Sequence, residues 1–444
     1  MTHFTVVGAG PVGTLMGLML AQRGHAVRLI ERRADPRSSP PERGRSINLA
    51  MAPRGLLALE QAGLADHIAP ALMPMPGRML HDERGALEFQ PYGQNAREII
   101  YAVSRERLNG MLIEAAAACP GIELRFDTRC VAVEPAAGAV VLSSERDHDS
   151  YRESFEILLG ADGAGSAVRA ALIARDYVSA REQPLEHDYK ELAIGPDASG
   201  GFAFEPRALH IWPRGSYMLI ALPNTDGSFT ATLFLSRHGD PGFDQLQTDA
   251  AVLRFFAAQF ADAARAIPDL AQQFAAHPQS RLGTLYCEHW QAEGRVLLLG
   301  DAAHAIVPFH GQGLNCGFED CRLLDELLGS AAARDITDYS GIFLRFERER
   351  RPDTDAIAAM ALENYQEMRD TVRSPLYAQR QALAMQLAQQ FPGRFIPRYS
   401  MVMFHPEIGY AEAQRRGAAQ QQVLDALLDD PGHRIETLLE RAGL

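Results

Sequence analysis

The chain has 444 residues and a formal net charge of −13. It is too long for a single core, and its acidity argues against nucleic acid or an anionic membrane as its main partner. No stretch approaches the roughly 20 apolar residues that span a bilayer, and the 5 cysteines form no C-x-x-C pair. We therefore expect a cytoplasmic protein of two or three subdomains, with free thiols and no metal site.

The amino-terminal pattern predicts a βαβ unit. A buried strand is expected over residues 4–8, a helix from Pro11 to about Arg23 and a second strand over 26–31. Residues 35–46 are rich in Pro, Ser and Arg, which is typical of a loop. The remaining elements expected in this half are helices over 53–63 and 104–118 and a strand pair on either side of Cys130.

The sequence pattern changes in the second half of the chain. Residues 188–236 contain alternating strands separated by turn signals, which predict an antiparallel sheet with one apolar face. Residues 250–276 are expected to be helical, a buried strand ends at Gly300, and another helix starts near Gly313. From about residue 340 onward the chain is mainly helical, and its last 24 residues predict a packed surface helix rather than a membrane anchor.

The sequence Gly8-Ala9-Gly10-Pro11-Val12-Gly13 lies between the first predicted strand and its helix. Gly8 permits the tight turn, Gly10 lets a pyrophosphate approach the backbone, and Gly13 lets helix and strand pack closely. Glu31 ends the second strand, where its carboxylate can accept hydrogen bonds from an adenosine ribose. This fingerprint predicts a bound dinucleotide, but it does not distinguish FAD from NAD.

Two further stretches extend the predicted cofactor site. Asp162 follows the strand-like Leu158-Leu159-Gly160, and Asp301 follows the buried strand that ends at Gly300. A carboxylate at the latter position suits a ribityl hydroxyl. The helix that starts near Gly313 would direct its positive end at the flavin pyrimidine and stabilise anionic reduced flavin.

These two aspartate stretches resemble the D-G and G-D motifs of the single-component flavin aromatic hydroxylases, the group similar to para-hydroxybenzoate hydroxylase. The resemblance implies resident FAD, with NADPH and O2 as transient co-substrates. It also implies an α/β fold, in which a Rossmann-like, glutathione-reductase-like FAD-binding domain carries an inserted antiparallel-sheet substrate domain and a C-terminal helical region. The expected boundaries are 1–75, 101–175 and 285–335 for the FAD-binding domain, 76–100 and 176–284 for the substrate domain, and 336–444 for the helical region.

Longer segments resemble the kynurenine 3-monooxygenases, over residues 4 to about 404. The similar segments are Gly44–Ala50, Val103–Arg105 with Leu108-Asn109, Leu209–Arg214, Ile220–Asn224, Pro308–Cys321 and Glu363–Arg369. The resemblance implies hydroxylation of L-kynurenine at ring position 3, through a flavin C4a-hydroperoxide, to give 3-hydroxy-L-kynurenine. Because an aniline ring is already activated by its amine, no acid–base side chain is expected to be indispensable, and His304 and His310 are interpreted as packed or loop histidines.

The resemblance also assigns residues to the two ligands. Arg78 and Tyr92 would bind the amino-acid end of the substrate, with Asn364 and Tyr399 as further contacts. Alternation along one strand brings Met218, Ile220 and Leu222 to one face, where an aromatic ring could lie. The other residues expected around that ring are Leu209, Phe234, Pro308 and Phe309. The full set of expected cofactor contacts is Gly8, Gly10, Val12, Gly13, Glu31, Arg32, Arg45, Ala50, Arg105, Cys130, Asp162, Asp301, Gly313, Leu314 and Asn315.

Three alternatives remain open at this point. The chain could hydroxylate another aromatic acid, since all the flavin motifs would be shared. It could also be a non-oxygenating flavin reductase or a flavin-binding sensor without catalysis. The sequence does not distinguish a monomer from a homodimer.

Overall fold

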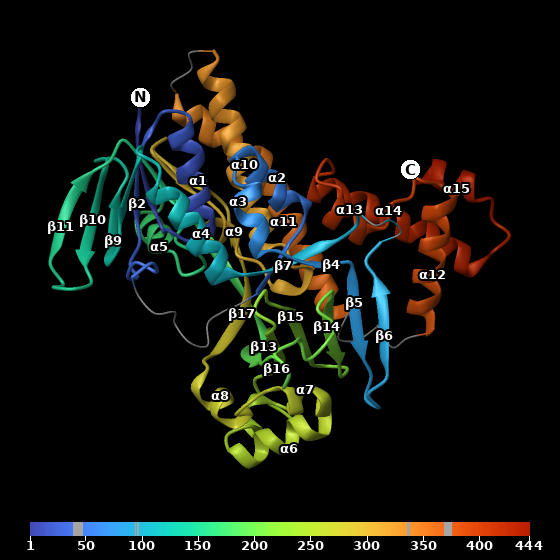
Figure 1. Ribbon diagram of the computed structural model, residues 1–444. Coiled ribbons are helices and arrows are strands. Elements are labelled where there is room, and N and C mark those ends of the chain that lie inside the picture. Colours follow the sequence, from blue (N-terminus) through green and yellow to red (C-terminus); the bar gives the residue numbers. More distant parts are fainter. Residues whose placement is uncertain (39–47, 94, 96, 335–337, 368–374) are drawn as a thin grey trace.

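The computed structural model describes residues 1–38, 48–93, 95, 97–334, 338–367 and 375–444 (Figure 1). The predicted loop residue Arg45 lies outside the described residues. The fold is mixed α/β, with a Rossmann-like region, a large second sheet and a C-terminal group of helices.

The Rossmann-like region is built on a six-stranded sheet in the order β18-β19-β12-β1-β2-β8. All its pairs are parallel except β18 with β19. Fully buried apolar strands of this kind need helices on both faces, and α1 and α10 supply part of that cover. The bounds are β1 His3–Val7, α1 Pro11–Gln22, β2 Ala26–Ile30, α4 Arg105–Ala117, β8 Ile122–Arg125, β12 Ile157–Gly160, β18 Gln291–Ala292, β19 Val296–Leu298 and α10 Gly313–Ala332.

The expected strand pair around Cys130 is wrong in one respect. Both strands form, but β8 pairs with β2 in the parallel sheet, whereas Cys130 lies within β9 (Thr128–Glu134) of a separate antiparallel sheet. Asp127 between them adopts a left-handed backbone with φ 53°, which redirects the chain. That sheet continues through β10 (Ala139–Ser144) and β11 (Ser150–Ser154), and a further sheet joins β3 (Asn48–Met51), β7 (Ile100–Ser104) and β4 (Met73–Met75).

The second large sheet has seven strands in the order β17-β13-β16-β15-β14-β5-β6. It departs from the fully antiparallel prediction because β14 and β5 pair in parallel. Strands so distant in sequence are joined by tertiary packing, which local patterns do not encode. The bounds are β5 Gly77–His81, β6 Leu87–Pro91, β13 Ala180–Ile194, β14 Ala208–Pro213, β15 Met218–Pro223, β16 Phe229–Ser236 and β17 Gln279–Cys287.

Both faces of this sheet are buried near its centre, although one apolar face was expected. Trp212, Leu219 and Leu233 point to one face and pack against the helical segment α6 to α8, which lies below the sheet in Figure 1. The segment expected to be helical over 250–276 is divided into α6 (Asp249–Gln259), α7 (Ala261–Ala266) and α8 (Leu270–Ala276). Residues of opposite parity, including Ile220, face the Rossmann-like region.

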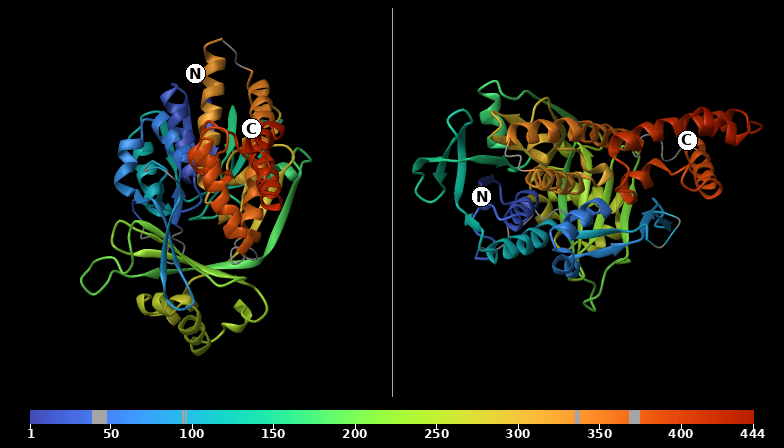
Figure 2. Two further views of the ribbon diagram at one scale, coloured as in Figure 1. Left: turned by 90° about the vertical axis from the view of Figure 1, so that its right-hand side faces the viewer. Right: turned by 90° about the horizontal axis from the view of Figure 1, so that it is seen from above.

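The helices from residue 375 onward lie at one end of the molecule, opposite the β9–β11 sheet, whereas the long helix before them packs against α10 (Figure 2). The single surface helix expected at the C-terminus is instead two helices, because Pro431 and Gly432 interrupt it. The elements are α11 Tyr339–Gln366, α12 Pro375–Gln390, α13 Arg398–Phe404, α14 Tyr410–Asp429 and α15 Ile435–Arg441. Among the described residues, none of the helices combines the length and apolar character that crossing a membrane requires.

Candidate active site

The predicted fingerprint forms a glycine turn between β1 and α1. Gly8 has φ +103°, and a Cβ there would lie 2.5 Å from the carbonyl oxygen of Ala161. A Cβ at Gly13 would lie 2.0 Å from the carbonyl oxygen of Gly8. At Gly10, by contrast, a Cβ would have no atom within 4 Å. Two glycines are therefore required by backbone packing, whereas Gly10 borders open space at the helix N-terminus, where a pyrophosphate fits.

The three predicted carboxylates have different surroundings. Glu31 is buried and accepts from the backbone N–H of Ala9 over 3.0 Å, which fixes it beside the glycine turn. Asp162 caps α5 (Ala167–Ile173), accepting from the N–H of Ala167 at 2.6 Å; its pKa is raised because burial outweighs its hydrogen bonds. Asp301 is exposed and has no hydrogen-bonding partner among the described residues, so its carboxylate is free to accept from a sugar hydroxyl.

The N-terminus of α10 approaches the same region. Gly313 begins the helix, and its neighbour Leu314 is half-buried. The side chain of Asn315 is fully buried and donates to the carbonyl of Ala50 at 2.8 Å while accepting from the N–H of Ala52 at 2.8 Å. Asn315 therefore fastens strand β3 to the helix, a role that sequence reasoning did not identify.

The remaining predicted cofactor contacts lie around this cradle. Val12 packs against Gly300, where a Cβ would lie 3.3 Å from it. Arg32 and Arg105 are exposed, and Arg105 is the first residue of α4. Cys130 is buried, which raises the pKa of its thiol to about 12, and Asp162 adds to that effect. It is therefore a neutral thiol under ordinary conditions.

Arg78, Tyr92 and Tyr399 are brought together from three distant parts of the chain. The Arg78 guanidinium carbon lies 5.5 Å from the ring centroid of Tyr92 and 5.4 Å from that of Tyr399. The two phenol rings stack with centroids 6.0 Å apart. The Tyr92 hydroxyl is buried and has no hydrogen-bonding partner in the described part of the chain. Burial, aided by Tyr399 and opposed by Arg78, raises its pKa well above the usual value. An unpaired buried hydroxyl beside a guanidinium is suited to a polar, anionic ligand group.

Asn364 lies on α11, and its amide donates to the carbonyl of Phe309 over 2.6 Å. It therefore fixes the short turn η3 (Pro308–His310), in which Pro308 is exposed. His310 in this turn stacks on Tyr399 with centroids 5.7 Å apart. Burial, then Arg398 and Arg78, lower its pKa to about 3, so the ring is neutral.

The predicted aromatic-ring residues fall into two adjoining apolar clusters. Leu209 and Leu222 pack with Tyr92 and Tyr399, and Met218 packs with Phe234 and Phe309. Ile220 contributes to both clusters. The apolar wall is thus continuous, with the Arg78 group at one end.

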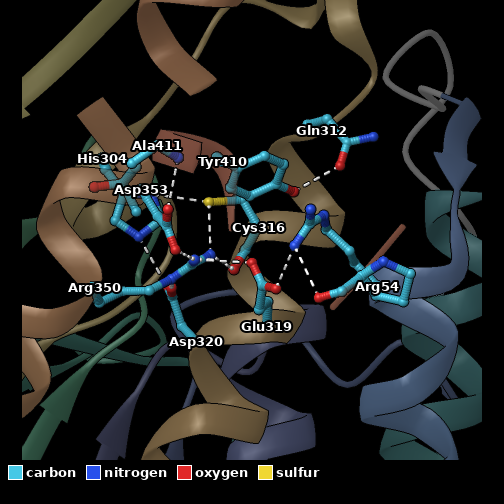
Figure 3. Close-up of polar contacts among 12 residues, drawn as sticks. Arg54, His304, Gln312, Cys316, Glu319, Asp320, Arg350, Asp353, Tyr410 and Ala411 are labelled. Carbon is cyan, nitrogen blue, oxygen red and sulfur yellow. Dashed lines mark hydrogen bonds and ion pairs between the residues drawn. The ribbon is translucent and has the colours of Figure 1, made fainter. Parts of the chain in front are cut away.

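A buried ionic network that includes side chains of α10 and α11 was not predicted (Figure 3). Arg350 forms ion pairs with Glu319 at 2.8 Å and with Asp320 at 2.7 Å, and Arg54 binds the other oxygen of Glu319 at 2.8 Å. His304 pairs with Asp320 at 2.7 Å. Burial acts to lower the pKa of His304, but Asp320 and Cys316 outweigh it and raise that pKa well above the usual value. The pairing with Asp320 therefore favours the charged form of His304 within this network.

His304, Cys316 and Asp320 have ligand atoms within 4.8 Å of one another, a spacing that could hold a metal ion. Arg350 argues against such a site, because its guanidinium donates to Asp320 and lies 3.1 Å from the Cys316 sulfur. A positive charge already compensates these groups.

Comparisons with known proteins bear on the whole chain. A family model described as "FAD binding domain" matches residues 1–359. The kynurenine 3-monooxygenase of Myxococcus xanthus (strain DK1622) is 44% identical over 438 residues, covering 99% of this chain and 93% of the relative. That of Stenotrophomonas maltophilia (strain K279a) is 45% identical over 422 residues, covering 95% and 91%.

Similar solved structures support the fold. The tetrameric form of 2-methyl-3-hydroxypyridine-5-carboxylic acid oxygenase has a TM-score of 0.67 at 19% identity, covering 84% of this chain and 94% of the other. The p-nitrophenol 4-monooxygenase of Pseudomonas putida DLL-E4 has a TM-score of 0.66 at 20% identity, covering 88% and 95%. With the glycine cradle and the extended sequence identity, these likenesses show that the chain belongs to the FAD-binding-domain flavoproteins and, within them, to the kynurenine 3-monooxygenase family.

Proposed function

We propose that this protein is an FAD-dependent monooxygenase that hydroxylates L-kynurenine at ring position 3, using NADPH and O2. The observation that carries the substrate assignment is the group of Arg78, Tyr92 and Tyr399 at the end of the apolar wall. A guanidinium between two phenols suits a carboxylate, and the adjoining wall suits an aromatic ring.

FAD would supply the redox chemistry, accepting hydride and activating dioxygen. The residues that would hold it are the Gly8–Gly13 turn, Glu31, Arg105 and Asp301. Their fit to the cofactor rests on open space at Gly10 and on the free carboxylate of Asp301. We infer that residues 1–75, 101–175 and 285–335 form the FAD-binding domain, with 76–100 and 176–284 as the substrate domain and 336–444 completing the pocket.

The protein's own contribution is to bind, orient and exclude water. Arg78 would pair with the substrate carboxylate, and the unpaired Tyr92 hydroxyl would donate to it, which fixes the distance of the ring from the cofactor. Met218, Ile220 and Phe234 would keep the ring out of water. The N-terminus of α10 would stabilise negative charge on the reduced cofactor.

The proposal is tested by following anaerobic reduction of the bound flavin by NADPH, with and without L-kynurenine, and then admitting oxygen and identifying the product. Acceleration of flavin reduction by L-kynurenine, together with formation of 3-hydroxy-L-kynurenine, is the expected result. NADH is run in parallel to establish the preferred reductant.

The same experiment separates the alternatives. A simple aromatic acid such as salicylate that is hydroxylated in preference to L-kynurenine would overturn the substrate assignment. Flavin reduction with hydrogen peroxide as the only product, whatever aromatic compound is present, would overturn monooxygenation. A protein that retains FAD but shows no reduction by either nicotinamide cofactor would be a binding protein rather than an enzyme.

A further inference from the structure

Glu191 lies in β13 and is buried on the side of the seven-stranded sheet that faces the Rossmann-like region. Its neighbours fix this orientation. Lys190 donates to two backbone carbonyls in and after α8, beneath the opposite face, and Leu192 packs in the core on that same side. Because side chains alternate along a strand, Glu191 points the other way. Its partner on β16 is Thr232.

Within the part of the chain that the structure describes, the surroundings of this carboxyl leave one of its oxygens without a hydrogen bond and give it a single neighbouring charge. Glu191 is 6% exposed, and its Oε2 has no hydrogen-bonding partner among the described residues. The neighbouring strand β16 presents the hydroxyl-bearing Thr230 and Thr232 on this face. β13 itself presents the phenol of Tyr189 two residues from Glu191 and, four residues away, the imidazole of His187, which bonds to the Ser216 carbonyl. Among the described residues, the one charged side chain that acts on the Glu191 carboxyl is Arg105. Burial raises the pKa of Glu191 to about 7, against the lowering effect of Arg105.

Arg105 stands at the junction of the two sheets. It follows Ser104, whose partner on β3 is Asn48. The Asn48 amide donates to the side-chain oxygen of Asn224 at 2.8 Å, and the Asn224 amide donates to the Thr230 hydroxyl at 3.2 Å. Thr230 shares a face of β16 with Thr232, the partner of Glu191, so this junction adjoins the face on which Glu191 lies. The Arg105 guanidinium is exposed and has no hydrogen bond or ion pair with the described residues, so it is available to an anion.

FAD and Glu191 would therefore compete for one cation. The cofactor carries a pyrophosphate whose negative charges would attract the Arg105 guanidinium, and it would also displace water from the junction. Both changes disfavour a carboxylate at Glu191 relative to the neutral acid. We propose that Glu191 is a cofactor-linked acid, whose carboxyl takes up one proton from solvent when FAD binds and stays protonated in the complex.

This inference rests on the FAD binding of the proposed function and on no assumption about the aromatic substrate. It requires FAD affinity to weaken as pH rises, because the ionised carboxylate of the free protein must first be neutralised. Between the pKa of Glu191 in the free protein and its higher pKa in the complex, the Kd for FAD should rise roughly tenfold per pH unit. The pyrophosphate of FAD does not titrate near neutrality, so the cofactor itself adds no such slope.

To test this, the purified holoenzyme is diluted at a series of pH values from about 6 to about 8.5, and the Kd for FAD is obtained from the fluorescence of the released cofactor. Wild type should release more FAD as pH rises, whereas Glu191→Gln should give a flat profile with the affinity that wild type has at the acid end. Glu182→Gln, an exposed position on the same strand, is the matched control and should follow wild type. If Glu191→Gln does not fold, Glu191→Met carries the same expectation.

A wild-type Kd that is independent of pH would overturn the inference, as would an unchanged slope in Glu191→Gln. Calorimetry of FAD returned to the diluted protein, in two buffers of different ionisation enthalpy, should show uptake of about one proton at alkaline pH. Absence of uptake in wild type would also overturn it, without any variant. Failure of the enzyme to hydroxylate L-kynurenine would leave these measurements untouched, so the two proposals fail separately.

Discussion

The hydroxyl of Tyr410 donates a 2.7 Å hydrogen bond to the side-chain oxygen of Gln312, although 98 residues separate them. Gln312 is fully buried and directly precedes the first residue of α10, whereas Tyr410 begins α14. This bond ties the C-terminal helices to the helix whose N-terminus approaches the cofactor region. Tyr399 lies on α13, another of these helices. The same hydrogen bond therefore also helps to fix the group of Arg78, Tyr92 and Tyr399 relative to α10.

Replacing Tyr410 by Phe should destabilise the protein without removing its FAD. The change leaves the Gln312 oxygen buried without a donor, which costs about 1–3 kcal/mol. Thermal unfolding of the holoenzyme should shift to lower temperature, while Tyr151→Phe, at an exposed position, should leave it unchanged. An unaltered unfolding temperature in Tyr410→Phe would mean that the hydrogen bond has no net effect on stability.

Arg350→Ala should be far more damaging than Arg348→Ala on the same helix. Arg350 is 1% exposed and compensates both Glu319 and Asp320, so its loss leaves buried carboxylates unpaired, at a cost of about 3–5 kcal/mol. The Arg348 side chain is 78% exposed, and its removal should matter little. Denaturant unfolding curves of the two variants provide the comparison, and equal effects would contradict the role assigned to the network.

Arg78→Ala should raise the KM for L-kynurenine by roughly tenfold to a hundredfold, because a charge-assisted hydrogen bond contributes about 1.5–3 kcal/mol. FAD content and NADPH oxidation without substrate should be retained, because Arg78 lies on the seven-stranded sheet and not on the sheet that carries the glycine turn. Arg84→Ala, in the exposed turn after the same strand, is the control. An unchanged KM would remove Arg78 from the substrate site.

His310→Ala should keep coupled hydroxylation. With a pKa of about 3, the His310 ring is neutral throughout the working range and gains a proton only in strong acid. Its titration therefore cannot produce a limb of the pH–rate profile near neutrality, and the variant should show the wild-type profile. Loss of hydroxylation with FAD still bound, or displacement of a neutral limb, would assign this ring a catalytic role.

Gly10→Ala and Gly13→Ala should fail in different ways. A Cβ at Gly13 meets the Gly8 carbonyl oxygen at 2.0 Å, so Gly13→Ala should disturb the fold itself. A Cβ at Gly10 meets nothing within 4 Å, so Gly10→Ala should fold normally and lose FAD affinity only because a cofactor occupies that space. Gly110→Ala, which also has open space around it, should affect neither property. Normal FAD affinity in Gly10→Ala would place the pyrophosphate elsewhere.

Much of the fold could be predicted because it depends on local order. The glycine fingerprint, β1, α1 and β2 lie within about thirty residues, and their geometry follows from steric and capping rules. Strand alternation likewise predicted that Met218, Ile220 and Leu222 share a face. The parallel pairing of β14 with β5 could not be predicted, because it joins strands that are distant in sequence.

The network around Arg350 escaped prediction for the same reason. Arg54, Glu319 and Arg350 come from three helices. Charged residues in helices are usually exposed to solvent, so nothing in the sequence marks these three as buried. Only the folded structure shows that all three are buried. Asn315 is a related case: the sequence placed it near the flavin, but its side-chain groups bind backbone atoms of β3 and the preceding turn.

The six-stranded sheet also constrains how the protein can fold as it is synthesised. Strand β19, at Val296–Leu298, pairs with β12, at Ile157–Gly160. One edge of β12 therefore stays unpaired during synthesis until the whole segment between the two strands has been made. An unpaired, fully apolar strand edge invites association with other chains. A nascent chain, or a truncation ending before Val296, would therefore carry an open sheet that closes only after Val296–Leu298 have been made, about two-thirds of the way along the 444 residues.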